Sequence, residues 1–444
     1  MRTRPPSGRG PAWPSRQAKG SHHVPDRAAW RSCCAIRTDR TPPERNRTLA
    51  RTALAAPSFL ARPPAPYLAH RLGTRLPARP PRSRETRNPV SQTPQSAARS
   101  KEPRLVLPPP RTPCPREAPA LRWGVLAPGV IAERFVEALQ SRTQQRVGAV
   151  GSRDAKRARA FADRFGIPSA YGSYAEVLDD RDVDIVYVAS PHSKHFDLAM
   201  QAIQAGRHVL VEKAFTRNAR EAEQLIAAAR ERGVFLMEAM WTRFLPHIDV
   251  VRQVLESGLL GEVQTVTADM GLPAEPDPAH RLFDLGLAGG ALLDLGIYPV
   301  SFASMVLGRF TSVTAIGTKT STGVDGQTSV IVGNEFGAHG VLNTTLFART
   351  PTTASISGSR ARLEIAGRFH RPTTVRLISP DDEVLDSFVS EQIDGGLCYE
   401  AAEAARCIAA GKLESGLMPL DETLDIMRVL DTIRRDLAVT YPGE

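Results

Sequence analysis

LRWGVLAPGVIA, residues 121–132, is the stretch that decides the fold of this chain. Its first six residues form an apolar run suited to a buried strand, and a helical pattern follows the break at Ala127-Pro128-Gly129. A dinucleotide fingerprint reads G-x-G-x-x-G/A. Here Ala127 replaces the first glycine, while Gly129 and Ala132 keep the other two positions. A plain strand–turn–helix looks similar, so nucleotide binding is predicted only because strands and helices go on alternating along the chain.

That alternation lasts from residue 121 to about residue 244 and predicts a doubly wound parallel sheet. The run IVYVA, residues 185–189, contains no charge, as expected of a central parallel strand. The predicted strands are residues 121–126, 146–150, 185–189, 208–211 and 234–238, and the predicted helices are residues 131–141, 152–165, 193–205 and 219–232.

Beyond residue 245 the pattern changes to short strand-like runs joined by turns. It predicts an α+β domain, residues 245–444, with one large, mostly antiparallel sheet. Residues 290–307 look helical, although no Ser, Thr, Asp or Asn caps their start and Pro299 should kink the helix. The other predicted strands are residues 263–270, 313–319, 328–335, 340–347, 354–358, 362–365, 374–378 and 384–388, and the other helices are residues 248–257, 400–410 and 420–437.

The first 120 residues have a different composition and are expected to form a disordered arm. They hold 23 of the 36 prolines and carry 24 Lys and Arg against 6 Asp and Glu. Residues 121–444 hold the remaining 33 basic and 41 acidic residues, so the folded part is mildly acidic and has no basic surface for nucleic acid. The arm is interpreted as upstream sequence included by an early start, with a targeting peptide or a binding arm as alternatives.

Other classes of protein are not favoured by the sequence. The N-terminus lacks the apolar segment of a secretory signal, and Asp294 and Pro299 interrupt the most apolar run, so no membrane partner is expected. The five cysteines include no C-x-x-C pair, and no cluster of metal ligands is predicted. A cytoplasmic location fits this usage best.

The end of the second predicted strand indicates which nucleotide is bound. NAD sites place Asp or Glu there, about 20 residues after the glycines, to bind the ribose hydroxyls. This chain has Ser152 and Arg153, and an arginine pairs with a 2′-phosphate. NADP is therefore predicted over NAD; the alternative is that Arg153 is a solvated charge at a helix start, and the neighbouring Asp154 slightly weakens the prediction.

Three further residues carry chemistry. Lys213 ends an apolar strand, where ligands bind in open α/β sheets, although many lysines there are ordinary surface residues. Asp294 and Tyr298 are four residues apart and so share one face of a helix. An Asp in the apolar run ALLDLGIYPV needs a partner or a function; the alternative is a structural hydrogen bond.

From residue 121 to about residue 440 the chain resembles the Gfo/Idh/MocA oxidoreductases, named for glucose–fructose oxidoreductase and inositol dehydrogenase. It is most similar to the branch with dimeric dihydrodiol dehydrogenase and NADP-dependent D-xylose dehydrogenase. The motifs that carry the resemblance are RWGVLAPGVIA (122–132), EKAFT (212–216), EAMWTRF (238–244) and DLGIY (294–298).

The resemblance implies roles for individual residues. Lys213 matches the active-site lysine of an E-K-P motif in which Ala214 replaces the proline, and Tyr298 matches the acid/base, with Asp294 as its partner. We expected Lys213 to bring the pKa of Tyr298 closer to working pH. His280 and Arg281 were considered for substrate contact, with a plain loop as the alternative. The residues expected at the cofactor are Ala127, Gly129, Val130, Ile131, Ser152, Arg153, Ser190, Pro191, His192, His195, Glu212, Lys213, Trp241 and Arg243.

The sequence thus predicts a Rossmann-type NADP-binding domain, residues 121–244, followed by a substrate-binding and dimerisation domain. The expected reaction is hydride transfer between NADP(H) and a hydroxyl carbon of a sugar, polyol or dihydrodiol. A homodimer is expected, because the family commonly covers the face of the broad sheet in this way. The alternative is a non-catalytic NADP-binding sensor, which would have no need to keep Lys213, Asp294 and Tyr298 together.

Overall fold

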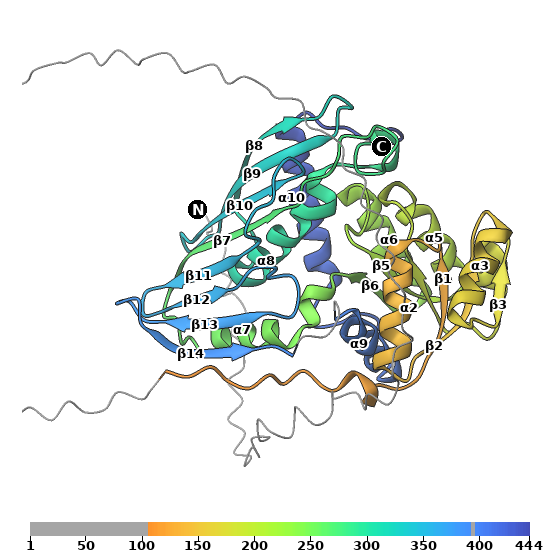
Figure 1. The fold of residues 1–444 in the computed structure, drawn as a ribbon, viewed down its shortest axis with the longest axis horizontal. Helices are drawn as coiled ribbons and strands as arrows, with labels where there is room; N and C mark the ends of the chain where they lie inside the picture. Colours follow the sequence, from red (N-terminus) through yellow and green to blue (C-terminus); the bar gives the residue numbers. More distant parts are fainter. Residues whose placement is uncertain (1–104, 392–395) are drawn as a thin grey trace, which may run out of the picture. The chain divides into compact units, whose positions relative to one another are not determined.

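Two sheets organise the protein in the computed structural model, which describes residues 105–391 and 396–444 (Figure 1). The first has six parallel strands in the order β3-β2-β1-β4-β5-β6, so the predicted doubly wound sheet is confirmed. The chain reverses its direction of winding between β1 and β4, and ligands bind at the carboxyl ends of the strands at such a point. The strands are β1 (Arg122–Leu126), β2 (Arg146–Gly151), β3 (Ser169–Tyr171), β4 (Ile185–Val188), β5 (His208–Glu212) and β6 (Leu236–Ala239).

The helices between these strands start and stop at residues that suit those positions. Asp154, Ser173 and Asn218 each cap a helix by accepting backbone N–H groups, and Gly166 and Gly233 end helices in the left-handed conformation. β3 and α4 were not predicted, because three and six residues are too few to show a period. The helices are α2 (Val130–Arg142), α3 (Ala155–Phe165), α4 (Tyr174–Asp179), α5 (His195–Gln204) and α6 (Ala219–Arg232).

The second sheet has eight strands in the order β14-β13-β12-β11-β7-β10-β9-β8. All neighbours are antiparallel except β7 and β10, so the prediction of a mostly antiparallel sheet is confirmed. The strands are β7 (Val263–Gly271), β8 (Ser312–Lys319), β9 (Asp325–Gly333), β10 (His339–Thr345), β11 (Ala354–Gly358), β12 (Arg362–Ile365), β13 (Thr374–Ile378) and β14 (Val384–Val389).

Helices α7 (Pro246–Glu256), α8 (Ile297–Leu307) and α10 (Leu420–Asp436) contact this sheet, whereas α9 (Leu397–Ala409) packs against α2. One continuous set of buried apolar side chains extends from the first sheet to the second. The predicted division into domains at residue 244/245 therefore stays a prediction.

The predicted helix at residues 290–307 begins with a π-helical turn, Leu292–Gly296, that runs into α8. A wider turn just before Pro299 accommodates a residue that lacks an N–H and crowds the preceding turn. The missing cap is supplied from β9, where the Asp325 carboxylate accepts the backbone N–H of Leu292 at 2.7 Å. Residues Leu285–Leu307 are long and apolar enough to cross a membrane, but 83% of their most apolar window is buried, as in a core helix.

Residues 105–120 are ordered, so the predicted end of the disordered arm at residue 120 is wrong; the rest of the predicted arm, residues 1–104, lies outside the described residues. The Leu107 side chain is 2% exposed. Arg111 forms ion pairs with Asp249 and Glu256 of α7. Further along, Gln145 donates a hydrogen bond to the Pro119 carbonyl. Composition misses this segment because its contacts are made with residues far along the chain.

Candidate active site

The loops that follow β1, β4, β5 and β6 lie at the same edge of the parallel sheet, because parallel strands all end on one side. They carry the fingerprint loop, the Ser190–His195 segment, Lys213 and Trp241 respectively. The π-helical turn and α8 add Asp294 and Tyr298. Residues that follow strands of the first sheet thus meet residues of a helix that packs on the second sheet.

Lys213, Asp294 and Tyr298 lie in direct contact. The Lys213 ammonium donates to the Asp294 backbone carbonyl at 2.7 Å and lies 3.3 Å from Asp294 Oδ1. It also lies 5.1 Å from the centre of the Tyr298 ring, within the range of a cation–π interaction. All three residues that the sequence singled out for chemistry are therefore brought together.

The charges in this cluster follow from burial and its neighbours. Burial alone would raise the pKa of Asp294, but Lys213 and Arg281 overcome it and hold that pKa below its ordinary value. Burial alone would lower the pKa of Lys213, but Asp294 reverses the shift and raises it. Both groups are therefore charged at neutral pH.

The pKa of Tyr298 differs from what the neighbouring Lys213 led us to expect. Burial raises the pKa of Tyr298 to about 12, and Lys213 opposes this shift without overcoming it. The expectation that Lys213 brings the pKa below its ordinary value of 10 is therefore wrong for the protein alone. Lys213 still lowers the cost of forming the phenolate.

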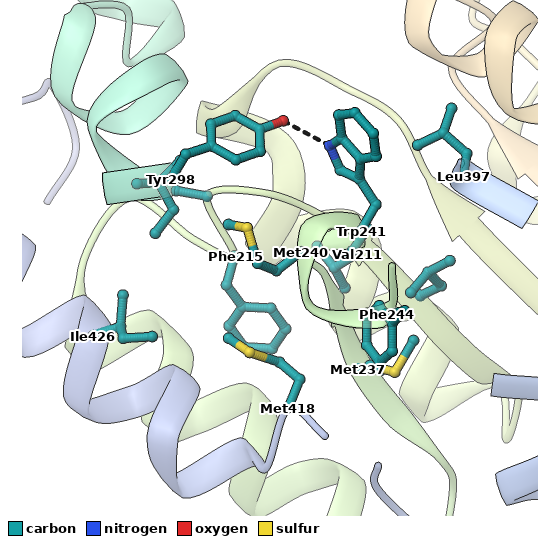
Figure 2. Packing of buried hydrophobic residues seen from close by; sticks show 14 of the residues in the cluster. Val211, Phe215, Met237, Met240, Trp241, Phe244, Tyr298, Leu397, Met418 and Ile426 are labelled. Carbon is teal, nitrogen blue, oxygen red and sulfur yellow. Dashed lines mark hydrogen bonds between the residues drawn. The ribbon is translucent and has the colours of Figure 1, made fainter. Parts of the chain in front are cut away.

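Among the described residues, the Tyr298 hydroxyl has one hydrogen-bond partner. Trp241 donates its indole N–H to the Tyr298 oxygen at 2.7 Å (Figure 2). The phenol O–H therefore remains available to donate to another molecule. The His370 ring packs against Tyr298, with ring centres 5.1 Å apart, and sequence reasoning missed it because no local pattern marks a single histidine near the end of a loop.

Glu212 was expected to contact the cofactor, but its side chain is directed into the core. It is 5% exposed and accepts a hydrogen bond from the Tyr187 hydroxyl. Burial raises the pKa of Glu212, with Lys213 opposing. Its backbone precedes Lys213, and the Lys213–Ala214 peptide bond is cis.

Hydrogen bonds from its two histidines hold the loop after β4 beside Lys213. His195 hydrogen-bonds the Ala214 and Ser190 carbonyls at 2.9 and 2.8 Å, and His192 hydrogen-bonds the Ala288 carbonyl at 2.9 Å. Burial lowers the pKa of His195 to about 4 and that of His192 to about 3, so both rings are neutral at neutral pH. Pro191, which directly precedes His192, is exposed at the edge of the site.

The fingerprint loop has the geometry of a phosphate-binding turn. A Cβ placed on Gly129 would meet nothing within 4 Å, and no side chain caps the N-terminus of α2, where Val130 is exposed. A helix N-terminus with open space before it suits a pyrophosphate. Ala132 is fully buried, as close packing of helix and strand requires.

Ala127 is the residue at which this loop departs from the fingerprint, and it has a φ of 70°. Glycine adopts this left-handed conformation without the penalty that a Cβ imposes. We expect Ala127→Gly to raise the free energy of unfolding by about 1 kcal/mol, measured by urea denaturation. Ala149→Gly, in the middle of β2, should lower it by a similar amount; a destabilised Ala127→Gly protein would contradict this account.

Ser152 and Arg153, the two residues after β2, lie in different surroundings. Ser152 is buried and its hydroxyl accepts the N–H of Asp154, whereas Arg153 is exposed and has no partner among the described residues. Arg157, which sequence reasoning missed, donates two hydrogen bonds to the Pro128 carbonyl in the fingerprint loop. Its position four residues after Arg153, on one helical face, was the available signal.

Two other arginines make contacts within the protein. Arg243, expected at the floor of the cofactor cleft, is 3% exposed and uses its guanidinium on Ser301 and Glu422. It joins the segment after β6 to α8 and α10. Arg281 reaches the site itself and pairs with Asp294.

Comparison with known proteins agrees with these features. Residues 121–240 match the model of the Gfo/Idh/MocA oxidoreductase family, NAD-binding Rossmann fold, and residues 248–364 match that of a Gfo/Idh/MocA C-terminal domain. The trans-1,2-dihydrobenzene-1,2-diol dehydrogenase of Macaca fuscata fuscata is 37% identical over 333 residues, covering 73% of this chain and 99% of its own. The chain belongs to the Gfo/Idh/MocA family. The predicted resemblance is confirmed, and so is the prediction of an NAD(P)-binding oxidoreductase.

Further similar proteins carry names for different activities. The human trans-1,2-dihydrobenzene-1,2-diol dehydrogenase is 35% identical, covering 73% of this chain and 99% of its own. A solved 3-ketoreductase from Actinomadura kijaniata, in complex with TDP-benzene and NADP, has a TM-score of 0.62 and 28% identity, covering 71% of this chain and 97% of its own. An aldose-aldose oxidoreductase from Caulobacter crescentus has a TM-score of 0.63 and 25% identity, covering 72% and 98%.

Proposed function

We propose that this Gfo/Idh/MocA oxidoreductase is an NADP-dependent dehydrogenase of vicinal hydroxyl compounds: sugars, polyols or dihydrodiols. The observation that carries the proposal is the contact of the Lys213 ammonium with both Asp294 and Tyr298 at the switch point of the parallel sheet. The relatives named for dihydrodiol and aldose oxidation support this substrate class. A nicotinamide bound here would accept or supply the hydride.

Tyr298 is the proposed acid/base. During oxidation the substrate carbon loses a hydride and its hydroxyl loses a proton, which Tyr298 accepts as the phenolate; reduction reverses both steps. The Trp241 N–H already donates to the Tyr298 oxygen and stabilises the phenolate form. The Lys213 charge does the same through space.

NADP is proposed as the cofactor over NAD. Gly129 and the open N-terminus of α2 would hold the pyrophosphate, and the unpaired guanidinium of Arg153 would bind the 2′-phosphate. The Ser190–His195 loop would lie along the nicotinamide, beside Lys213. NADP in the complex of the Actinomadura 3-ketoreductase supports this choice.

The proposal is tested by nucleotide binding and turnover in the full-length protein. We expect NADPH to bind more tightly than NADH by fluorescence titration, and NADP⁺ to be reduced in the presence of a sugar, polyol or dihydrodiol. Arg153→Ala should weaken NADPH binding by tenfold or more and leave NADH binding unchanged, because it removes one charged hydrogen bond. Arg159→Ala, at an exposed arginine of α3, the helix that follows Arg153, is the control. Binding without turnover on any of these substrates would support the sensor alternative.

We also propose that a second copy of this chain covers the open face of the eight-stranded sheet. Ile316, Ile331 and Val341 on neighbouring strands are 74%, 57% and 50% exposed. Thr314, Ile331 and Val341 are paired in register and so share a face. Exposed apolar side chains grouped on one sheet face are typical of an interface. The expected cytoplasmic location stays a prediction.

The second copy is tested by sedimentation velocity. Ile331→Asp should convert a dimer into a monomer, because it places an unpaired charge at the centre of the interface. Phe336→Asp, in the turn between β9 and β10, changes an even more exposed residue outside that face and should leave the dimer intact. A monomeric wild-type protein at micromolar concentration would contradict the proposal.

A further inference from the structure

Asp294 has two carboxylate oxygens in very different surroundings. Oδ1 accepts hydrogen bonds from both terminal nitrogens of Arg281, each at 3.1 Å, and from the Lys213 ammonium at 3.3 Å. Oδ2 has no hydrogen-bond partner among the described residues. This oxygen is not fully buried, so it keeps contact with solvent. One oxygen is thus held by two cations, and the other is open to the site.

Arg281 reaches Asp294 from outside the catalytic cluster. It lies in the loop between β7 and the π-helical turn, and its side chain is 49% exposed, against 12% for those of Lys213 and Asp294. Both of its terminal nitrogens approach a single oxygen, so the contact determines how the carboxylate is rotated. A lysine at this position would supply the charge without the two-pronged geometry.

We propose that Arg281 is a positioning residue that holds Asp294 by Oδ1, so that Oδ2 is presented to a hydroxyl of the substrate beside the reacting one. This inference rests on the proposed function and assigns to the site its preference for vicinal hydroxyls. Arg281 acts through Asp294 and touches no reacting atom. Arg281 also has an electrostatic effect. Because it pairs with Asp294, the negative charge of Asp294 is balanced by two cations instead of by Lys213 alone.

The charged groups around Lys213 and Asp294 determine how the loss of Arg281 would affect the phenolate form of Tyr298. Lys213 is faced by Asp294, Tyr298, Glu212 and Arg281, and His192 faces Asp294. With Arg281 present, two cations surround one carboxylate next to Tyr298. Without it, Lys213 and Asp294 form a neutral pair, and the phenolate form of Tyr298 loses a net positive charge nearby, which makes that form harder to reach.

The test compares Arg281→Ala, Arg281→Lys and the control Arg309→Ala in the holoenzyme. Arg309 is an exposed arginine outside the site, 3.9 Å from Asp425. For Arg281→Ala we expect kcat/KM for a vicinal diol to fall at least tenfold more than kcat/KM for the matching mono-alcohol. The rise of the oxidation rate with pH should shift upward by about one unit for both substrates. Arg281→Lys should restore the pH profile but not the diol preference, and Arg309→Ala should resemble wild type.

A combined variant separates positioning from a general loss of structure. If Arg281 acts through Asp294, Arg281→Ala should cost little more in an Asp294→Asn background, measured by single-turnover hydride transfer. Equal losses for diol and mono-alcohol, or losses that add fully in the double variant, would overturn the inference. Inactive wild-type enzyme would instead contradict the proposed function itself.

Discussion

Lys213→Ala is expected to lower kcat about 1,000-fold while the Kd for NADPH changes less than threefold. The substitution removes the ammonium that lies against both the Asp294 carboxylate and the Tyr298 ring. Without that charge the phenolate loses its main electrostatic support in a buried site. Stopped-flow hydride transfer and fluorescence titration measure the two quantities separately.

The control for this substitution is Lys412→Ala. Lys412 is an exposed lysine after the end of α9, outside the site. It should behave as wild type in both assays. A Lys213→Ala enzyme with near-normal kcat would refute the assignment, and a protein with lost NADPH binding would show that the substitution disturbs the fold of the cleft. Circular dichroism of each variant checks the fold directly.

Tyr298→Phe is expected to lower kcat by 10³-fold or more in both directions, because the ring stays and only the proton-transfer group is lost. The Trp241 N–H would also lose its partner. Oxidation requires the phenolate, and burial holds the pKa of Tyr298 at about 12. The wild-type oxidation rate should therefore rise with pH between about 7 and 10, whereas reduction, which uses the protonated phenol, should stay nearly flat in this range. The residual oxidation rate of Tyr298→Phe should not rise in this way.

Tyr171→Phe is the matched control, since Tyr171 donates its hydroxyl to Asp180 outside the site. It should retain the wild-type pH profile. A Tyr298→Phe enzyme that keeps the rise of the oxidation rate with pH would show that another group accepts the proton. His370, which packs on the Tyr298 ring, would then be the first residue to replace.

Much of the fold could be read from the sequence because it depends on local periods. The alternation of strands and helices up to residue 244 predicted a parallel sheet, and parallel strands all end at one edge. Lys213, directly after β5, therefore had to lie at the same edge of the sheet as the fingerprint loop after β1. Elements too short to show a period, such as β3 and α4, escaped this reasoning.

Other features of the structure could not be predicted, because they depend on contacts between residues far apart along the chain. Composition predicted that residues 105–120 would be disordered, yet Leu107 is buried and Arg111 pairs with Asp249, 138 residues away. Glu212 was predicted to lie at the cofactor, and this stays a prediction; its side chain is buried and accepts a hydrogen bond from Tyr187, 25 residues away. No window of sequence contains both partners of such a contact.

The sequence by itself determined the winding of the parallel sheet, the place of Lys213 at its edge and the four-residue spacing of Asp294 and Tyr298, because each follows from a period of two or 3.6 residues. Only the tertiary structure decided that Lys213 meets Asp294 across 81 residues, that Trp241 donates to Tyr298 across 57, and that Arg281 occupies one oxygen of Asp294. It also decided the charges of these groups. A pKa depends on burial and on neighbours brought together by folding, and neither is present in the unfolded chain.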